Sequence, residues 1–196
     1  MKSIILASQS PRRKQLLEWA EVPFEVVTQS TDETYPAGMA LPEIPVHIAR
    51  EKALAVKKMV QHAFHAQHAK ETILAADTLV MLGDKVIGKP KDRDDAVAIL
   101  TELAGNTHLV ITGVVILHAG GEIAFQDTTE VSFHPLTQEQ IEYYVDTYQP
   151  YDKAGAYAIQ EWIGVTGIAR INGDFYNVMG LPVSRVVQAL EQLGGE

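Results

Sequence analysis

The 196-residue sequence contains no cysteine. This absence excludes disulfide bonds, a thiol nucleophile and cysteine-ligated zinc sites, and it agrees with a reducing compartment. No apolar run approaches the roughly 18 residues that a membrane-spanning helix needs. The short apolar segment 4–7 is followed at once by Arg12 and Arg13, which is unlike a signal peptide. We therefore expect a cytoplasmic protein with no membrane partner.

Positive charge is also scarce, because 16 Lys and Arg residues stand against 25 Asp and Glu residues, a net charge of -9. This balance argues against duplex nucleic acid as a partner. Residues 1–120 carry 13 basic and 14 acidic residues, whereas residues 121–196 carry 3 and 11. Short basic clusters in an acidic protein favour a small anionic ligand, although they equally suit a solvated surface. The clusters are Arg12–Lys14, Arg50 with Lys52, and Lys89, Lys91 and Arg93.

Strand-like and helix-like segments are mixed along the chain, which predicts an α/β or mixed α+β fold. Hydrophobic residues make up 46% of the sequence, and there is no repeat or low-complexity stretch, as is typical of a globular protein. Segment 29–45 is predicted to be a long loop, and such loops are often functional. The predicted strands are 3–7, 24–27, 73–76, 78–82, 86–87, 109–117 and 122–133, and the predicted helices are 11–20, 46–61, 94–103, 137–148 and one after Pro182.

The segment before the first predicted helix favours an anion-binding site. Ser10 can cap the helix, and Pro11 suits the first helical position. The hydroxyls of Ser8 and Ser10 precede the helix, and Arg12 and Arg13 lie in its first turn, where positive charge opposes the helix dipole at a cost of about 0.3–1 kcal/mol. Because a helix N-terminus also binds phosphate readily, we predict phosphate binding here. The alternative is an ordinary capped helix with exposed arginines.

A carboxylate interrupts an apolar run at Asp77. A buried, unpaired carboxylate is costly, so Asp77 must lie at the end of a strand, accept hydrogen bonds or bind a cation. Asp32 and Glu33, in the long loop, could complete a divalent-metal site with Asp77, since Mg²⁺ binds carboxylates and substrate phosphates. The alternative is that this acidic pair is simply solvated.

Other patterns do not predict function. Gly83-x-x-x-x-Gly88-Lys89-Pro90 is close to a phosphate-binding P-loop, but Pro90 replaces the required Ser or Thr. These glycines also fall in a predicted hairpin, although Lys89 can still face a phosphate. No Gly-x-Ser-x-Gly motif supports a serine hydrolase. A histidine triplet fits the end of a helix better than a metal site: His62, His65 and His68.

The ordered set of motifs resembles the Maf family of nucleoside triphosphate pyrophosphatases. The markers cover nearly the whole chain, and together they are highly specific although each alone is weak. They are Leu-Ala-Ser-Gln-Ser-Pro-Arg-Arg (6–13), Asp-Glu-Thr (32–34), Ala-Arg-Glu-Lys-Ala (49–53), Ala-Ala-Asp-Thr (75–78), Gly-Lys-Pro (88–90), Asp-Lys-Ala-Gly-Ala-Tyr (152–157), Ile-Gln (159–160) and Asn-Val-Met-Gly-Leu-Pro (177–182).

The resemblance implies one domain over residues 1–196, with a curved mixed sheet flanked by helices and two lobes around a cleft, akin to inosine triphosphatase. It implies hydrolysis of a nucleoside triphosphate to the monophosphate and pyrophosphate, with Mg²⁺ or Mn²⁺ required. One branch of the family prefers dTTP and UTP, and another prefers 7-methyl-GTP. This chain is similar to the first branch at Arg12, Thr78 and Gln160, and it departs from many relatives, which carry Gly, at Glu161. A homodimer is expected by analogy.

The resemblance also implies roles for individual residues. Asp77 is expected to be the general base, and Glu33 and Asp77 are expected to bind the metal. The two tasks of Asp77 conflict in part, because a metal-bound carboxylate is a weaker base, so the sequence leaves open whether Asp77 is the base, a metal ligand or both. Thr78 and Gln160 are expected to read the pyrimidine edge. Two alternatives are a 7-methyl-GTP pyrophosphatase and a nucleotide-binding regulator of septum formation without turnover. The phosphate-binding set is predicted to comprise Ser8, Ser10, Arg12, Arg13, Lys52 and Lys89.

Overall fold

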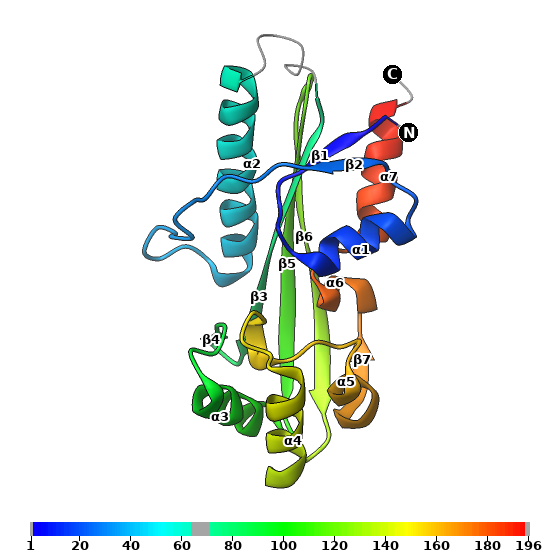
Figure 1. Cartoon of the computed structure of the whole chain (residues 1–196). Helices are drawn as coiled ribbons and strands as arrows, with labels where there is room; N and C mark the ends of the chain where they lie inside the picture. Colours follow the sequence, from blue (N-terminus) through cyan, green and yellow to red (C-terminus); the bar gives the residue numbers. More distant parts are fainter. Residues whose placement is uncertain (1, 64–70, 195–196) are drawn as a thin grey trace. The chain divides into compact units, whose positions relative to one another are not determined.

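The computed structural model describes residues 2–63 and 71–194. His65 and His68 of the histidine triplet lie outside these described residues. The elements, drawn in Figure 1, are β1 (Ile4–Leu6), α1 (Pro11–Trp19), β2 (Phe24–Val26), the 3₁₀ helix η1 (Leu41–Glu43), α2 (Ile44–Ala63), β3 (Ile73–Leu82), β4 (Lys85–Ile87), α3 (Arg93–Leu103), β5 (Thr107–His118), β6 (Gly121–Phe133), α4 (Gln138–Tyr148), the 3₁₀ helix η2 (Ala154–Ala156), α5 (Trp162–Gly167), β7 (Ile168–Asn172), α6 (Phe175–Met179) and α7 (Val183–Gly194).

The strands of the described residues form one seven-stranded sheet in the order β2-β1-β3-β5-β6-β7, with β4 paired to β3. β1 pairs in parallel with both β2 and β3, whereas β4 on β3 and β7 on β6 are antiparallel. The sheet is therefore mixed and flanked by helices, which confirms the predicted fold class. Within the same residues, every helix is too short or too polar to cross a membrane.

The chain divides into two compact units. The first comprises Met1–Asp77, Thr112–Asp127 and Gly180–Glu196, and the second comprises Thr78–Ile111 and Thr128–Met179. The boundaries fall inside β3, β5 and β6, so each of these long strands contributes residues to both units.

In the first unit, α2 covers one face of the strands and α1 and α7 lie on the other (Figure 1). The predicted apolar face of α2 is confirmed, because its small residues Ala49 and Ala53 are fully buried. Residues on one face of a strand alternate with residues on the other. The face toward α2 is built from Ile5, Ala7, Ile73, Ala75, Val115 and Leu117.

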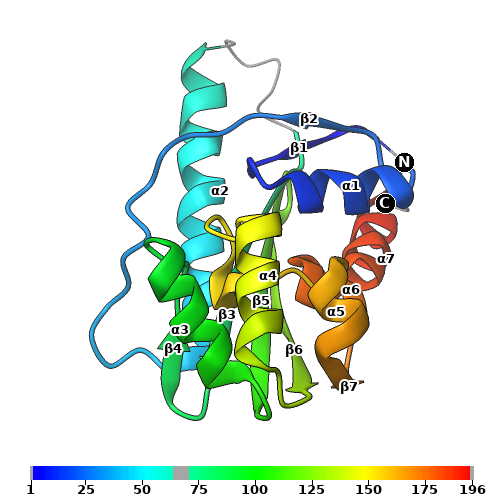
Figure 2. The ribbon, with the colours of Figure 1, turned by 60° about the horizontal axis from the view of Figure 1, so that its bottom comes forward.

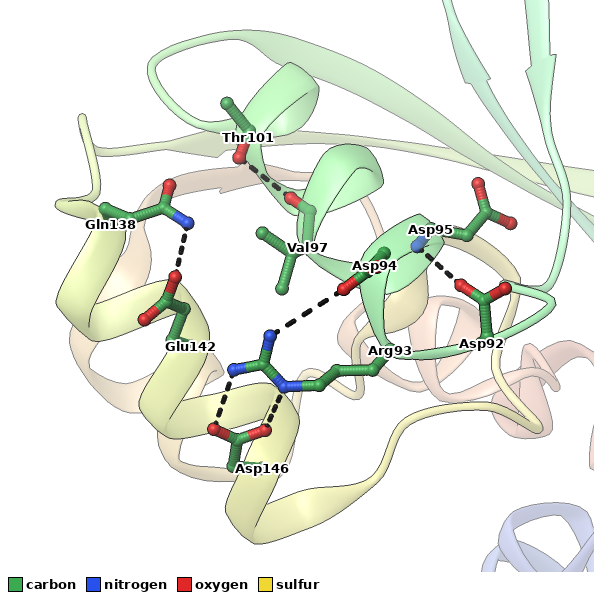
Figure 3. Close-up of polar contacts among 9 residues, drawn as sticks. All are labelled: Asp92, Arg93, Asp94, Asp95, Val97, Thr101, Gln138, Glu142 and Asp146. Carbon is green, nitrogen blue, oxygen red and sulfur yellow. Dashed lines mark hydrogen bonds and ion pairs between the residues drawn. The ribbon is translucent and has the colours of Figure 1, made fainter.

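In the second unit, α3 and α4 lie side by side (Figure 2). Arg93 at the start of α3 donates from Nε to Asp146 Oδ1 at 2.6 Å and from Nη2 to Oδ2 at 2.9 Å (Figure 3). This hydrogen-bonded pair raises the pKa of Arg93 and lowers that of Asp146. Arg93 was grouped by sequence with Lys89 and Lys91 as a candidate anion contact. The structure instead uses it to join two helices.

Several local predictions are confirmed. Thr137 and Gln140 form the predicted capping box at the start of α4. The hairpin of β3 and β4 has Gly83 in its turn at φ 58°, a conformation that favours glycine. Because β4 itself lies between Gly83 and Gly88, the two glycines do not belong to a single loop between a strand and a helix, and the P-loop interpretation is excluded as expected.

Other boundaries differ from the predictions. The two strands predicted around Asp77 are one continuous strand, β3. Helix α2 begins at Ile44, so the long loop ends earlier than expected. Pro45 is tolerated there because N–H groups in the first turn have no partner within the helix. β7, α5 and α6 were not predicted, because five or six residues are too few to show a periodic pattern.

Gly113 on β5 makes room for the first turn of α2. A Cβ at this position would lie 2.2 Å from the backbone N of Val46 and 2.3 Å from the carbonyl carbon of Pro45. Backbone atoms cannot yield as a flexible side chain can, so only glycine fits without moving the helix.

We predict that Gly113→Ala lowers the free energy of unfolding by about 2–3 kcal/mol, the scale of an overpacked core position. Chemical denaturation would measure the change. Gly88→Ala is the matched control, because a Cβ there meets nothing within 4 Å, and its effect should stay below about 0.5 kcal/mol. Equal stabilities of the two variants would contradict the close approach.

The second unit buries a histidine. His108 on β5 is 1% exposed, its Nε2 lies 2.7 Å from the Tyr157 hydroxyl, and its ring stacks on Phe133. Among the described residues its Nδ1 has no hydrogen-bond partner. Burial lowers the pKa of His108 from 6.5 to about 4, so the ring is neutral in the folded protein at neutral pH.

We predict that the protein loses stability as the pH falls from 6.5 toward 4. In this range the unfolded chain binds a proton at position 108 that the folded chain does not bind. The free energy of unfolding therefore falls by up to about 3 kcal/mol from its value above pH 6.5. Denaturant unfolding at several pH values would measure this loss. His108→Gln should flatten the pH dependence, whereas His134→Gln, at an exposed position, should preserve it. Identical slopes for the wild type and His108→Gln would refute the prediction.

Candidate active site

Asp77 lies in the middle of β3, on the face that packs against α2. Ile73 and Ala75 contact the α2 face of the core, and the alternation of a strand places Asp77 on the same side. Lys52 on α2 reaches this carboxylate, with Nζ 2.7 Å from Asp77 Oδ1. Asp77 is therefore a hydrogen-bonded residue inside a strand, and the strand-end alternative is wrong.

The same ammonium group binds a second carboxylate. Glu33, from the segment between β2 and η1, has its Oε1 2.7 Å from Lys52 Nζ. The side chains of Lys52 and Asp77 are only 17% and 15% exposed, whereas that of Glu33 is 53% exposed. The neighbouring Asp32 is exposed. Residues 33, 52 and 77 thus meet at one partly buried ion-paired site.

Arg13 brings a buried positive charge to this part of the first unit. It is 9% exposed, its Nε donates to the backbone oxygen of Gly180 at 2.7 Å, and its Nη1 donates to Ser8 Oγ at 3.1 Å. Burial lowers the pKa of Arg13, and the negative charges of Asp77 and Glu33 oppose that shift. A guanidinium stays protonated in proteins. Arg13 is therefore a fixed cation within electrostatic range of both carboxylates.

The start of α1 differs in detail from the prediction. Ser10 stands at the capping position before Pro11, but its side chain makes no capping hydrogen bond. The backbone N–H of Ser10 instead donates to Ser8 Oγ at 3.3 Å. Ser8 is buried, whereas Ser10 and Arg12 are half-buried. The first turn holds no acidic residue, so the helix dipole and the arginines together make this end of α1 positive.

The remaining predicted residues belong to the second unit. Thr78 follows Asp77 in the same strand, and consecutive strand side chains point to opposite faces, so the side chains of Thr78 and Asp77 lie on opposite faces of β3. Lys89 is exposed in the segment after β4, and Gln160 is exposed in the turn before α5. The structure thus gathers Glu33, Lys52 and Asp77 directly, with Arg13 in electrostatic range. It assigns Thr78, Lys89 and Gln160 to separate positions of the other unit.

Arg50 does not join the site. Its guanidinium donates to Glu122 Oε1, from Nε at 2.9 Å and from Nη2 at 2.7 Å, and this hydrogen bond raises the pKa of Arg50. The basic pair Arg50 and Lys52 therefore divides between a structural contact to β6 and the carboxylate site. The carbonyl of Gly180 is a contact that sequence reasoning missed, because no residue type reveals a backbone acceptor.

The two carboxylates suit a divalent cation. No group of three or more His, Cys, Asp or Glu side chains gathers as a metal site in the part of the chain that the structure describes. Mg²⁺, however, commonly binds through one or two carboxylates together with substrate phosphates. Glu33 and Asp77 already meet around one positive charge, that of Lys52. Their oxygens therefore fit the needs of Mg²⁺ or Mn²⁺ when phosphates supply the other ligands.

Comparison with known proteins identifies the family. The profile of the family described as Maf-like protein matches residues 3–193. The dTTP/UTP pyrophosphatase of Cytophaga hutchinsonii is 47% identical over 97% of this chain and 84% of its own length. That of Phocaeicola vulgatus is 47% identical over 97% and 95%, and that of Halalkalibacterium halodurans is 45% identical over 99% and 97%.

Among solved structures, the Staphylococcus aureus Ham1 protein matches 67% of this chain and 72% of its own chain at 15% identity, with a TM-score of 0.39. A match this weak carries no argument. The family profile and the relatives, in contrast, cover nearly all of both sequences. This chain belongs to the family of Maf-like proteins.

Proposed function

We propose that this chain is a nucleoside triphosphate pyrophosphatase that hydrolyses dTTP and UTP to the monophosphate and pyrophosphate. The three relatives named above are dTTP/UTP pyrophosphatases. The observation that carries the proposal is the convergence of Glu33 and Asp77 on Lys52, within electrostatic range of buried Arg13. Cleavage of a polyphosphate depends mainly on fixed charges that position and neutralise it.

The phosphate chain binds at the start of α1. The positive end of the helix and the half-buried groups of Ser10 and Arg12 offer donors to phosphate oxygens. Ser8 and Arg13 are already hydrogen-bonded to each other. Their main contribution is therefore the fixed positive charge of Arg13 near the phosphates. Lys89 is exposed and would add a further positive charge around the phosphates.

Asp77 acts on the attacking water. Its Oδ1 is held by Lys52 at 2.7 Å, which fixes the orientation of the carboxylate. The carboxylate then orients the water and accepts its proton as the bond between the α and β phosphates breaks. A fixed orientation matters because the water must attack in line with the leaving pyrophosphate.

Glu33 and Asp77 would hold a Mg²⁺ or Mn²⁺ ion. Such an ion neutralises negative charge on phosphate oxygens and acts as a Lewis acid. The side chain of Glu33 is 53% exposed, so it can leave Lys52 and bind another cation. Lys52 keeps the two carboxylates together in the meantime, because two like charges at short range would otherwise repel each other.

Gln160 and Thr78 read the pyrimidine edge. An amide offers both a donor and an acceptor, which is the pairing that a uracil or thymine edge requires.

Two other functions compete with this proposal. A 7-methyl-GTP pyrophosphatase would use the same phosphate site with another base, and a non-catalytic regulator of septum formation would bind nucleotide without turnover.

A substrate panel tests the function. The purified protein would be incubated with dTTP, UTP, 7-methyl-GTP and ATP in the presence of Mg²⁺, and pyrophosphate and orthophosphate release would be measured separately. We expect pyrophosphate from dTTP and UTP, and its loss when EDTA removes the metal. Preferential turnover of 7-methyl-GTP would favour the first alternative, and nucleotide binding without any product would favour the second.

We predict that Asp77→Asn reduces turnover of UTP by at least 10²-fold, the usual range for a lost general base, while thermal unfolding still shows a folded protein. Asp146→Asn is the matched control, because Asp146 also accepts hydrogen bonds from a cation, Arg93. That pair is exposed on the surface, so its loss should cost at most about 1 kcal/mol of stability and leave turnover unchanged. Near-normal turnover by Asp77→Asn would remove this carboxylate from the chemistry.

A further inference from the structure

Gln160 stands in a tight turn that follows the motif 152–157. The backbone N–H of Glu161 donates to the carbonyl of Ala158 at 3.1 Å, which closes the turn and leaves Ile159 and Gln160 between its ends. Ile159 is 3% exposed, whereas Gln160 is exposed. The turn is therefore anchored by one side chain and presents the other to solvent.

A single buried hydroxyl holds both ends of this turn. Tyr144 on α4 is 0% exposed. Its hydroxyl oxygen accepts the backbone N–H of Ala158 at 3.1 Å, and the same hydroxyl donates to Glu161 Oε2. Because residues 158 and 161 are the two ends of the turn, Tyr144 and Glu161 together form a clamp around Gln160. We call these contacts the turn clamp.

Two further contacts restrict the turn. Lys153, 8% exposed, places its Nζ 3.7 Å from Glu161 Oε1 and 2.8 Å from Asp152 Oδ1. The two carboxylate oxygens of Glu161 are thus engaged by two different groups. On the other side, a Cβ at Gly164 would lie 1.7 Å from the carbonyl oxygen of Ile159, so the backbone of α5 packs directly on the turn.

Glu161 stands at the position before α5 where a side chain commonly caps the helix. It precedes α5 as its capping residue, yet its side chain makes no capping hydrogen bond. Side chains at this position commonly stabilise a helix by accepting its free N–H groups. Here the carboxylate turns to Tyr144 instead. Its contacts therefore serve the turn rather than the helix.

We propose that Glu161 is a positioning residue that sets nucleobase selectivity by holding Gln160 through the turn clamp. The proposal rests on the proposed function, in which the Gln160 amide meets the pyrimidine edge. An exposed Gln loses side-chain and backbone freedom when it binds a base, and a backbone that is already fixed reduces this loss.

The test compares kcat and KM for UTP and 7-methyl-GTP in variants of the full chain. Glu161→Ala removes the clamp and should raise KM for UTP about fivefold, the effect of one hydrogen bond, with kcat within twofold, because base binding is lost equally in the ground and transition states. The ratio of kcat/KM for UTP to that for 7-methyl-GTP should fall by a similar factor. Glu161→Gln, which can still accept the Tyr144 hydroxyl, should keep both values within twofold of the wild type.

The matched control is Glu142→Ala. Glu142 lies on α4 and accepts a hydrogen bond from Gln138 at 2.7 Å on the helix surface (Figure 3), so its removal should leave both kinetic constants unchanged. Tyr144→Phe removes the clamp hydroxyl alone and should reproduce the effect of Glu161→Ala. It provides the same measurement if Glu161→Ala does not fold, which thermal unfolding would reveal.

A double-mutant cycle decides whether Glu161 acts through Gln160. In a Gln160→Ala background, Glu161→Ala should cause no further change in the selectivity ratio, since residues that act as one unit are not additive. A full additional loss in that background would overturn the proposal. So would an unchanged ratio in Glu161→Ala, or a loss in Glu161→Gln as large as in Glu161→Ala. A wild-type protein without pyrophosphatase activity would instead refute the proposed function itself.

Discussion

The contact between Lys52 Nζ and the Asp77 carboxylate is the interaction on which the first unit depends. β3 runs through Asp77 without a break, and a carboxylate 15% exposed in a strand would destabilise that strand if it had no partner. The ammonium group of Lys52 supplies the partner. It also brings Glu33, from a segment without regular structure, to the same point.

Small residues make this contact possible. Lys52 reaches β3 only because α2 lies close to the strands, and the helix can approach because Ala49 and Ala53 form its buried face. Gly113 allows the same close approach at the start of the helix, because a Cβ at this position would overlap the backbone of Val46. Side-chain volume in the core therefore determines where the charged groups meet.

The arginines of the basic clusters differ in their surroundings, which their charge alone does not reveal. Arg50 and Arg93 form surface ion pairs with Glu122 and Asp146, which join separate elements within each unit. Exposed pairs of this kind contribute about 0–1 kcal/mol each. Arg13, in contrast, is buried and hydrogen-bonded to a backbone carbonyl. It is also within electrostatic range of Asp77 and Glu33, whereas the sequence groups all three arginines alike as members of basic clusters.

The amino-acid sequence by itself determined the class of the fold, most of its elements, the family, and the residue types of the proposed phosphate-binding site. These features follow from local patterns: the α2 alanines, the Thr137 capping box and the motif around Ser8 are visible within short segments. Tertiary structure alone decided that Lys52 binds Glu33 and Asp77 and that Arg13 binds the carbonyl of Gly180. It also decided that the Glu161 side chain bonds to Tyr144 and does not cap α5. Each of these contacts joins segments that only folding brings together, and strand alternation, helix packing and burial, which depend on the whole chain, select the partners.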